Sequence, residues 1–221
     1  MNRVVLSRPD NVNNRFRKSR FQAFKRLVAN AIAKKNFCRI LDVGGTLEYW
    51  RSFQADLDWS KVDVTLVNLD PDLVDLPGFK SLYCDARSIS QFADNSFDVV
   101  HSNSVIEHVG RWNDMAAMAG EVRRLAPAYF VQTPYFWFPL EPHARTLFFH
   151  WMPECWRYRL LMRRSLGFWP QQPNLGSAVT AVQSALLLDK RQMQFLFPDA
   201  RIVPERCFGL TKSLIAIRED S

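Results

Sequence analysis

At 221 residues, the chain is long enough for one substantial α/β domain and too short for two of comfortable size. Hydrophobic residues make up 48% and charged residues 23%, which are the proportions of a globular protein and exclude general disorder. No apolar run approaches the roughly 18 residues that span a bilayer, and the basic N-terminus lacks the apolar segment of a secretory signal. A cytoplasmic location is expected, with peripheral contact to a membrane as an option.

The net charge of +7 is concentrated at the start of the chain. Residues 1–39 contain eleven Lys or Arg and one acid, Asp10, so this segment is +10 and the remainder is −3. Residues 1–14 have no periodicity, whereas apolar residues from Phe16 to Ile32 recur at helical spacing. We therefore expect a first region, residues 1–36, with a loose leader and an amphipathic helix from Arg15. Such a segment suits either a solvated helix or a surface for nucleic acid or an anionic membrane.

Short β-rich runs alternate with helical stretches over the next hundred residues. The pattern predicts strands at 39–43, 62–69, 80–84, 97–102 and 128–133, with a helix at 115–125 before the last of them. Strands joined through helices pair in parallel with right-handed crossovers. The sequence therefore predicts an α/β fold with a doubly wound sheet over the second region, residues 37–221.

The alternation stops after the fifth strand, where an aromatic-rich insertion occupies about residues 135–188. Between Arg145 and Arg164 it has five Arg and one acid, Glu154. This composition fits a subdomain with its own aromatic core, a lid over an apolar acceptor, or a surface for bases or lipid. Asp189 is then placed to cap a helix, and residues 200–207 and 212–218 are expected to be an antiparallel pair of closing strands.

Glycines or acids follow the first three predicted strands. Gly44 and Gly45 let the backbone turn tightly and let a ligand approach closely, beside an acid at position 42. Asp70 comes 26 residues after Gly44, where a Rossmann-type fold places a carboxylate for ribose hydroxyls. Asp85 can accept a hydrogen bond from an exocyclic amine. One such acid could simply cap a helix, but three in register predict a nucleotide-type cofactor site at the carboxyl edge of the sheet.

The ordered segments LDVGG, VNLDP, YCDAR, FDVVHSNSVIEHV and RRLAPAYFVQTPY resemble the class I S-adenosylmethionine-dependent methyltransferases, in particular the type 11 methyltransferase domain. The resemblance covers roughly residues 38–135 and is most specific in FDVVHSNSVIEHV. It implies a Rossmann-like, seven-stranded, mostly parallel sheet with an antiparallel last strand, and S-adenosyl-L-methionine as cofactor. It also implies which residues contact each part of that cofactor: Asp42, Gly44 and Gly45 the methionine, Asp70 the ribose, Asp85 and Ala86 the adenine, and Ser102 and Asn103 the floor.

The glycine turn departs from the family pattern. Thr46 and Glu48 occupy alternating positions where the family usually has further glycines. A side chain at position 46 narrows the approach to the cofactor. Glu48 is expected to start the next helix, where an acid suits the helix dipole.

Three residues are candidates for action on the methyl acceptor. Methyl transfer from a sulfonium is an in-line displacement, so alignment supplies much of the rate and a base is needed only if the acceptor loses a proton. His108, Tyr135 and His143 could serve as that base, although His108 could instead tie a loop and His143 could be an ordinary exposed residue. No His, Cys or Asp spacing indicates a metal site, so none is expected.

The sequence therefore predicts an enzyme that transfers a methyl group from S-adenosylmethionine to an unidentified small-molecule, glycan or lipid-linked acceptor. Two alternatives stay open. One is a catalytically inactive Rossmann-like protein that binds nucleic acid or a membrane through its basic and aromatic segments. The other is a nicotinamide-dependent oxidoreductase, although the turn lacks the full GxGxxG phosphate cradle. Nucleic acid is the less favoured partner, whereas peripheral membrane contact fits the basic and aromatic segments.

Overall fold

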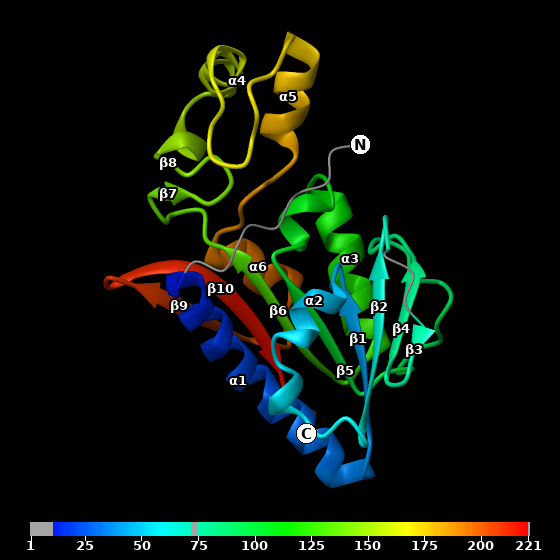
Figure 1. Ribbon diagram of the computed structural model, residues 1–221. Helices are drawn as coiled ribbons and strands as arrows, with labels where there is room; N and C mark the ends of the chain where they lie inside the picture. The colour runs from blue at the N-terminus through cyan, green and yellow to red at the C-terminus, as the bar shows by residue number, and fades with distance from the viewer. Residues whose placement is uncertain (1–10, 72–74, 221) are drawn as a thin grey trace.

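The computed structural model describes residues 11–71 and 75–220 (Figure 1). Within these residues, eight strands form one sheet in the order β3-β4-β2-β1-β5-β6-β10-β9. The seven expected strands are present, and β3 (Asp75–Leu76) adds a two-residue edge. The bounds of the parallel strands are Cys38–Val43 for β1, Val62–Asn68 for β2, Phe79–Tyr83 for β4, Val99–Asn103 for β5 and Ala128–Pro134 for β6.

The last strand of the chain runs against its neighbours. β10 (Leu210–Arg218) pairs antiparallel with both β6 and β9 (Arg201–Cys207). Its pairing with β9 is a hairpin, because only Phe208 and Gly209 connect these two strands. The predicted α/β fold with a mostly parallel sheet and an antiparallel last strand is therefore confirmed.

The central strands are buried on both faces. Six of the seven residues of β6 are buried, as are five of the six in β1, which is the pattern of parallel strands covered by helices on each side. In the register, Asp42 of β1 lies opposite Leu66 of β2 and His101 of β5. The carboxyl ends of β1, β2 and β5 therefore lie along one edge.

Two helices, α1 (Asn11–Lys35) and α2 (Leu47–Arg51), cover one face. Phe21 and Phe24 of α1 are fully buried in a core cluster with strand residues of the sheet, and the Phe21 ring stacks on Phe53 at 3.9 Å between centroids. The helix begins at Asn11, four residues before the predicted start, because a helix that is already nucleated extends at little cost. Residues 1–10 of the predicted leader lie outside the described residues.

The opposite face is covered by α3 (Trp112–Leu125) and α6 (Lys190–Leu196). Met115, Val122 and Met193 are fully buried in the core cluster on this side. Asp189 caps α6, as predicted, by accepting a hydrogen bond from the backbone of Gln192 at 2.8 Å. No helix in the described part of the chain is long and apolar enough to cross a membrane.

The insertion stands beyond the end of the sheet from which β6 leaves (Figure 1). It comprises a two-stranded ribbon, a 3-10 turn at Phe149–Trp151 and two helices. Five buried residues give it a small core of its own, but only one of them, Phe149, is aromatic, so this core is mainly aliphatic and differs from the aromatic core considered from the sequence. The ribbon strands are β7 (Leu140–Glu141) and β8 (Thr146–Leu147), the helices are α4 (Glu154–Arg163) and α5 (Leu175–Gln183), and the core is Ala144, Phe149, Leu161, Leu166 and Val182.

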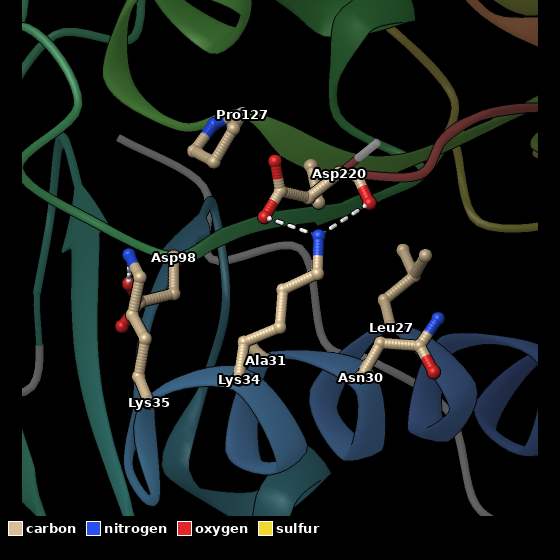
Figure 2. Close-up of a pocket in the computed structure, with 9 residues that line it drawn as sticks. Leu27, Asn30, Ala31, Lys34, Lys35, Asp98, Pro127 and Asp220 are labelled. Atoms are coloured by element: carbon tan, nitrogen blue, oxygen red, sulfur yellow. Dashed lines mark hydrogen bonds and ion pairs between the residues drawn. The ribbon is translucent and has the colours of Figure 1, made fainter.

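The C-terminal end of α1 is fixed to the opposite, amino edge of the sheet (Figure 2). Asp98, just before β5, accepts hydrogen bonds from Lys35 Nζ at 2.5 Å and from the backbone of Arg39 at 2.7 Å. Lys34 Nζ lies 3.1 Å from the carboxylate of Asp220. A cavity of only about 10 Å³, enough for about one water molecule, is bordered by Lys34, Lys35, Asp98 and Asp220. This edge is therefore a point of attachment for α1, and the predicted cofactor residues lie at the other edge.

Candidate functional site

The glycine turn after β1 is shaped by close packing. Gly44 has a φ of +75°, and a Cβ there would lie 2.5 Å from Cγ2 of Val105. A Cβ on Gly45 would lie 1.8 Å from Oδ2 of Asp42. Thr46 begins α2 as its N-cap, and Glu48 falls in the first turn of that helix as predicted. Gly44 and Gly45 stand where the fold leaves no space for a side chain, and the side chain of Thr46 caps α2.

Asp42 lies beneath this turn in a buried polar network. Its carboxylate accepts hydrogen bonds from Nε1 of Trp50 and Nδ1 of His101, both at 2.7 Å. Because a carboxylate only accepts, Nδ1 of His101 donates to Asp42. In the neutral ring Nε2 then accepts from the hydroxyl of Tyr49 at 3.4 Å. His101 was not predicted as a site residue. Its signal is a histidine within a predicted strand, directly after the apolar pair Val99 and Val100.

The next two acids differ in their surroundings. Asp70 is exposed just after β2. Asp85, just after β4, is paired with Arg87 at 2.6 Å, and Arg87 also reaches Asp114 at 3.1 Å. Hydrogen bonds from Arg87 hold the pKa of Asp85 below its ordinary value. Asp70 is therefore accessible at this edge, whereas Asp85 is held in an ion pair with Arg87. Half-buried Ala86 follows Asp85 as an apolar surface.

The end of β5 connects the sheet to α1. Ser102 is fully buried and donates from Oγ to the carbonyl of Val43 at 3.2 Å. Asn103 accepts a hydrogen bond from Arg20 of α1 at 2.9 Å. Arg20 also lies 3.4 Å from Glu205 of β9, and its burial lowers its pKa. Helix α1 thus places the guanidinium of Arg20 at the carboxyl edge. The helical periodicity of the sequence did not reveal this contact.

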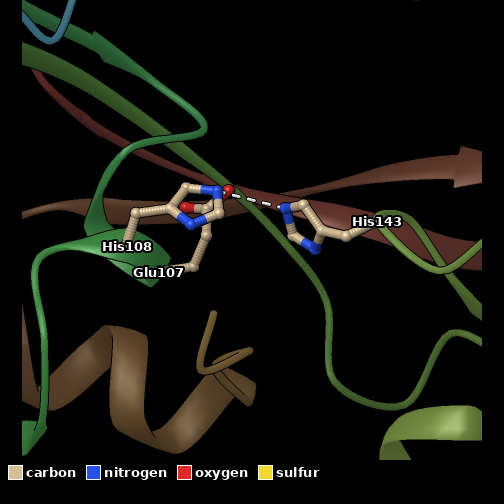
Figure 3. Close-up of side chains that lie close together, drawn as sticks. All are labelled: Glu107, His108 and His143. Carbon is tan, nitrogen blue, oxygen red and sulfur yellow. Dashed lines mark hydrogen bonds between the residues drawn. The ribbon is translucent and has the colours of Figure 1, made fainter. Parts of the chain in front are cut away.

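The structure brings together two of the three residues predicted to act on the acceptor (Figure 3). Nε2 of His108, at the end of a 3-10 turn after β5, lies 3.1 Å from Nε2 of His143 in the insertion. Nδ1 of His108 donates to the carbonyl of Ser184, and Nδ1 of His143 to the carboxylate of Glu141, each at 2.8 Å. In their neutral forms both rings therefore face each other with unprotonated Nε2 atoms.

Glu141 also accepts a hydrogen bond from the backbone of Ala144. Burial opposes protonation of His143, but its hydrogen bond to Glu141 outweighs burial and raises the pKa of His143 above its ordinary value. The insertion thereby presents a histidine whose orientation and basicity are set by a buried carboxylate.

Glu107 is a site residue that the sequence interpretation did not single out. It is 1% exposed, and its Oε2 accepts a hydrogen bond from Thr133 at the end of β6 at 2.9 Å. Its Oε1 is buried and has no hydrogen-bond partner among the described residues. The carboxylate oxygen of Glu107 and the ring nitrogens of His108 and His143 all lie within 4.8 Å of one another.

Tyr135, the third predicted acceptor-side residue, lies at the start of the insertion. It lines an open cavity of about 580 Å³ together with Trp137, Asp189 and Gln194. The His108–His143 pair does not line this cavity. Tyr135 and the histidine pair therefore border different surfaces of the insertion.

Three exposed aromatic rings lie together on the insertion, and we call them the aromatic cluster: Trp137, Phe148 and Trp151. They are 58%, 50% and 39% exposed, and the Trp151 ring lies 6.0 Å from Trp137 and 5.1 Å from Phe148. Nε1 of Trp151 donates to the carbonyl of Phe136 at 2.9 Å, which fixes its ring. A contiguous exposed aromatic surface of this kind is suited to an apolar ligand or a lipid interface.

Residues 41–127 match the family described as "Methyltransferase domain". This span includes the glycine turn, Asp70, Asp85, the end of β5 and the His108 turn, and it ends just before β6. No curated protein is significantly similar to the chain. The resemblance inferred from the sequence motifs is therefore confirmed for these residues.

Solved structures share the fold at low sequence identity. A putative zinc-dependent alcohol dehydrogenase from Rhodobacter sphaeroides matches with a TM-score of 0.53 and 9% identity over 83% of this chain and 84% of the other. The PH0226 protein from Pyrococcus horikoshii matches with a TM-score of 0.50 and 14% identity over 90% of each chain. A SAM-dependent methyltransferase from Methanosarcina mazei gives 0.48 and 16% identity over 83% and 92%. At these identities the likeness shows the fold alone.

Proposed function

We propose that this chain, with its methyltransferase domain at residues 41–127, transfers a methyl group from S-adenosylmethionine to an acceptor held beneath the insertion. The observation that carries the proposal is the shared carboxyl edge of β1, β2, β4 and β5. Each of these strands ends there in a residue suited to one part of an adenosyl cofactor. S-adenosylmethionine supplies an electrophilic methyl group on a sulfonium when it is bound.

The polar groups and apolar surfaces at this edge match the parts of such a cofactor. The exposed carboxylate of Asp70 can accept from two vicinal ribose hydroxyls. Asp85 and Ala86 offer an acceptor and an apolar surface to the adenine, while Ser102 and Asn103 form the floor. Gly44 and Gly45 would lie against the methionine portion, with Asp42 beneath them fixing the turn through Trp50 and His101.

The acceptor side is proposed to lie where the insertion meets the sheet. His108 comes from the methyltransferase domain and His143 from the insertion, and their ring nitrogens meet at 3.1 Å. Residues at such a junction can contact a molecule held between the two parts. Tyr135 borders a separate open cavity, so it would contact only an acceptor long enough to extend beyond the histidine pair. The aromatic cluster favours an acceptor with an apolar portion, such as a lipid-linked small molecule or glycan.

Calorimetric titration with S-adenosylhomocysteine tests the cofactor part of the proposal. Asp70→Ala is expected to weaken binding at least 10-fold, about 1.4 kcal/mol, because the ribose hydroxyls lose their acceptor. Asp63→Ala is the matched control, since Asp63 is an exposed acid near the opposite end of the same strand. The control is expected to bind like the unmodified protein.

Two outcomes would contradict the cofactor proposal. The first is the absence of binding at millimolar S-adenosylhomocysteine. The second is equal affinity in the Asp70 and Asp63 variants, which would move the ligand away from the end of β2. Titration with NADH, followed by its fluorescence, serves as the comparison for a nicotinamide-dependent enzyme, and tighter binding of NADH would favour that alternative.

A further inference from the structure

Three electron-pair donors converge where the insertion meets the end of β5 (Figure 3). Glu107 offers a carboxylate oxygen, and His108 and His143 each offer Nε2, with all three atoms within 4.8 Å of one another. The sequence indicated no metal site because His143 is 35 positions beyond His108, a separation that only the folding of the insertion closes.

Hydrogen bonds from Nδ1 fix the orientation of the His108 and His143 rings. Nδ1 of His108 donates to a carbonyl and Nδ1 of His143 to a carboxylate, so each neutral ring points a lone pair toward the other. Two lone pairs 3.1 Å apart repel unless a cation lies between them. Backing of a histidine by a carboxylate or carbonyl is the arrangement that orients imidazole ligands of metal ions.

A proton between the two histidine rings would not account for the buried carboxylate of Glu107. A proton shared by the two rings would satisfy both nitrogens, but Oε1 of Glu107 is buried and without a partner among residues 11–71 and 75–220. An unpartnered oxygen on a buried carboxylate is costly. A metal ion would engage all three donors at once. Tetrahedral ligands of zinc lie about 3.4 Å apart, so two donors 4.8 Å apart would have to approach each other by about 1.4 Å.

We propose that Glu107, His108 and His143 bind a divalent first-row transition-metal ion, with Zn²⁺ as the representative case. Two imidazoles and one carboxylate form a ligand set used by catalytic zinc sites, in which water or substrate takes the remaining position. Glu141 and the carbonyl of Ser184 are positioning groups, since they act through the histidines. The turn after β5 and the insertion together supply the three protein ligands.

Metal binding is independent of the proposed methyl transfer and can be measured without any methyl donor. If an acceptor oxygen occupies the open position, the ion favours loss of its proton, a consequence that does rest on the proposed function. The two proposals can fail separately, because zinc and S-adenosylhomocysteine are titrated as different ligands at different residues.

Calorimetry with Zn²⁺ on the chelator-treated full chain, followed by visible spectroscopy with Co²⁺, tests the site. One ion per chain is expected, together with the d–d absorption of protein-bound Co²⁺. His143→Ala is expected to weaken Zn²⁺ binding by about 100-fold and to abolish that absorption, while Glu141→Gln should weaken binding about 10- to 100-fold. His150→Ala is the matched control, since His150 lies in the insertion and bonds to the carbonyl of Phe136. The control should keep full affinity.

Glu107→Gln keeps the size of the side chain, so the variant is expected to fold. Weaker Zn²⁺ binding by this variant can then be assigned to the lost carboxylate. Circular dichroism and the thermal midpoint of each variant are recorded beside the titrations. Loss of binding in folded Glu107→Gln supports the site. The proposal is overturned if the unmodified protein binds no Zn²⁺ below about 100 μM, or if His143→Ala and Glu107→Gln bind it as tightly as His150→Ala.

Discussion

The sheet with its covering helices and the insertion differ in how they bury apolar side chains. The sheet is packed between two large core clusters, one with α1 and α2 and one with α3 and α6. The insertion has five buried residues at its centre and leaves Trp137 58% and Trp156 60% exposed. A well-packed sheet can hold a cofactor edge in a fixed geometry, whereas a lightly packed insertion can adapt to an acceptor.

The two regions meet at the histidine pair. The backbone of Leu186, at the exit of the insertion, donates to the carbonyl of Glu107 at 2.8 Å, and His108 bonds to Ser184. The insertion is thus fixed to the domain at the residues proposed to act on the acceptor. Mutations in the sheet domain should therefore act mainly on the free energy of unfolding, and mutations on the surface of the insertion mainly on substrate binding.

The largest difference in the free energy of unfolding is expected between mutations in the core beneath α1 and mutations in the insertion core. Phe24→Ala removes a fully buried ring from the cluster between α1 and the sheet and should lower the free energy of unfolding by about 3–5 kcal/mol. Phe149→Ala removes a ring that is 1% exposed from the insertion core and should cost less than half as much in global unfolding, because the insertion can open locally. Urea unfolding followed by circular dichroism measures both. Equal losses would show that the insertion and the sheet unfold as one unit.

A smaller effect, dependent on pH, is expected where α1 joins the amino edge. Burial opposes ionisation of Asp98, but hydrogen bonds from Lys35 and Arg39 outweigh it and hold the pKa of Asp98 below its ordinary value. A carboxyl whose pKa is depressed on folding stabilises the protein above its unfolded pKa of about 3.9, and this stability is lost as the pH falls through the folded pKa. Asp98→Asn should therefore cost about 1–3 kcal/mol at pH 7 and progressively less toward pH 3.

Urea unfolding at both pH values measures the Asp98 effect. Asp94→Asn is its control, because the exposed Asp94–Arg124 pair should contribute within about 1 kcal/mol at pH 7. A cost for Asp98→Asn that does not shrink at low pH would mean that ionisation of Asp98 has no part in joining α1 to the sheet.

The smallest effect on stability is expected at the aromatic cluster. Trp137→Ala should change the free energy of unfolding by no more than about 0.5 kcal/mol, because the ring is 58% exposed. The fraction of protein that sediments with phosphatidylglycerol vesicles should nevertheless fall several-fold in this variant. Trp156→Ala, on α4 and 60% exposed, is a control of the same residue type. Similar losses in both variants would argue against a role specific to the cluster.

Much of the sheet could be predicted because its strands are short apolar runs between turns. Parallel pairing then placed Gly44, Asp70, Asp85 and Asn103 at one edge without any knowledge of side-chain contacts. The antiparallel end was also predictable, since only two residues separate β9 from β10. The start of α1 was misplaced because residues 11–14, three Asn and one Val, carry no apolar periodicity, although the helix continues through them.

The partners of the site residues could not be predicted in the same way. Asp42 and His101 are 59 positions apart, and their hydrogen bond depends on the register between β1 and β5. His143 reaches His108 only because the insertion returns to the turn after β5. The buried, unpartnered oxygen of Glu107 is a consequence of three-dimensional packing, for which a Glu-His pair in the sequence gives no signal.

Hydrogen–deuterium exchange with and without S-adenosylhomocysteine tests the central claim, that the cofactor lies along the carboxyl edge. The account predicts slower exchange at residues 43–49, 84–88 and 102–105 on addition of the ligand. The exposed turn between β9 and β10 at Phe208 and Gly209 should not change and serves as the internal reference. Protection confined to the insertion, or equal at the reference turn and the edge, would contradict the account.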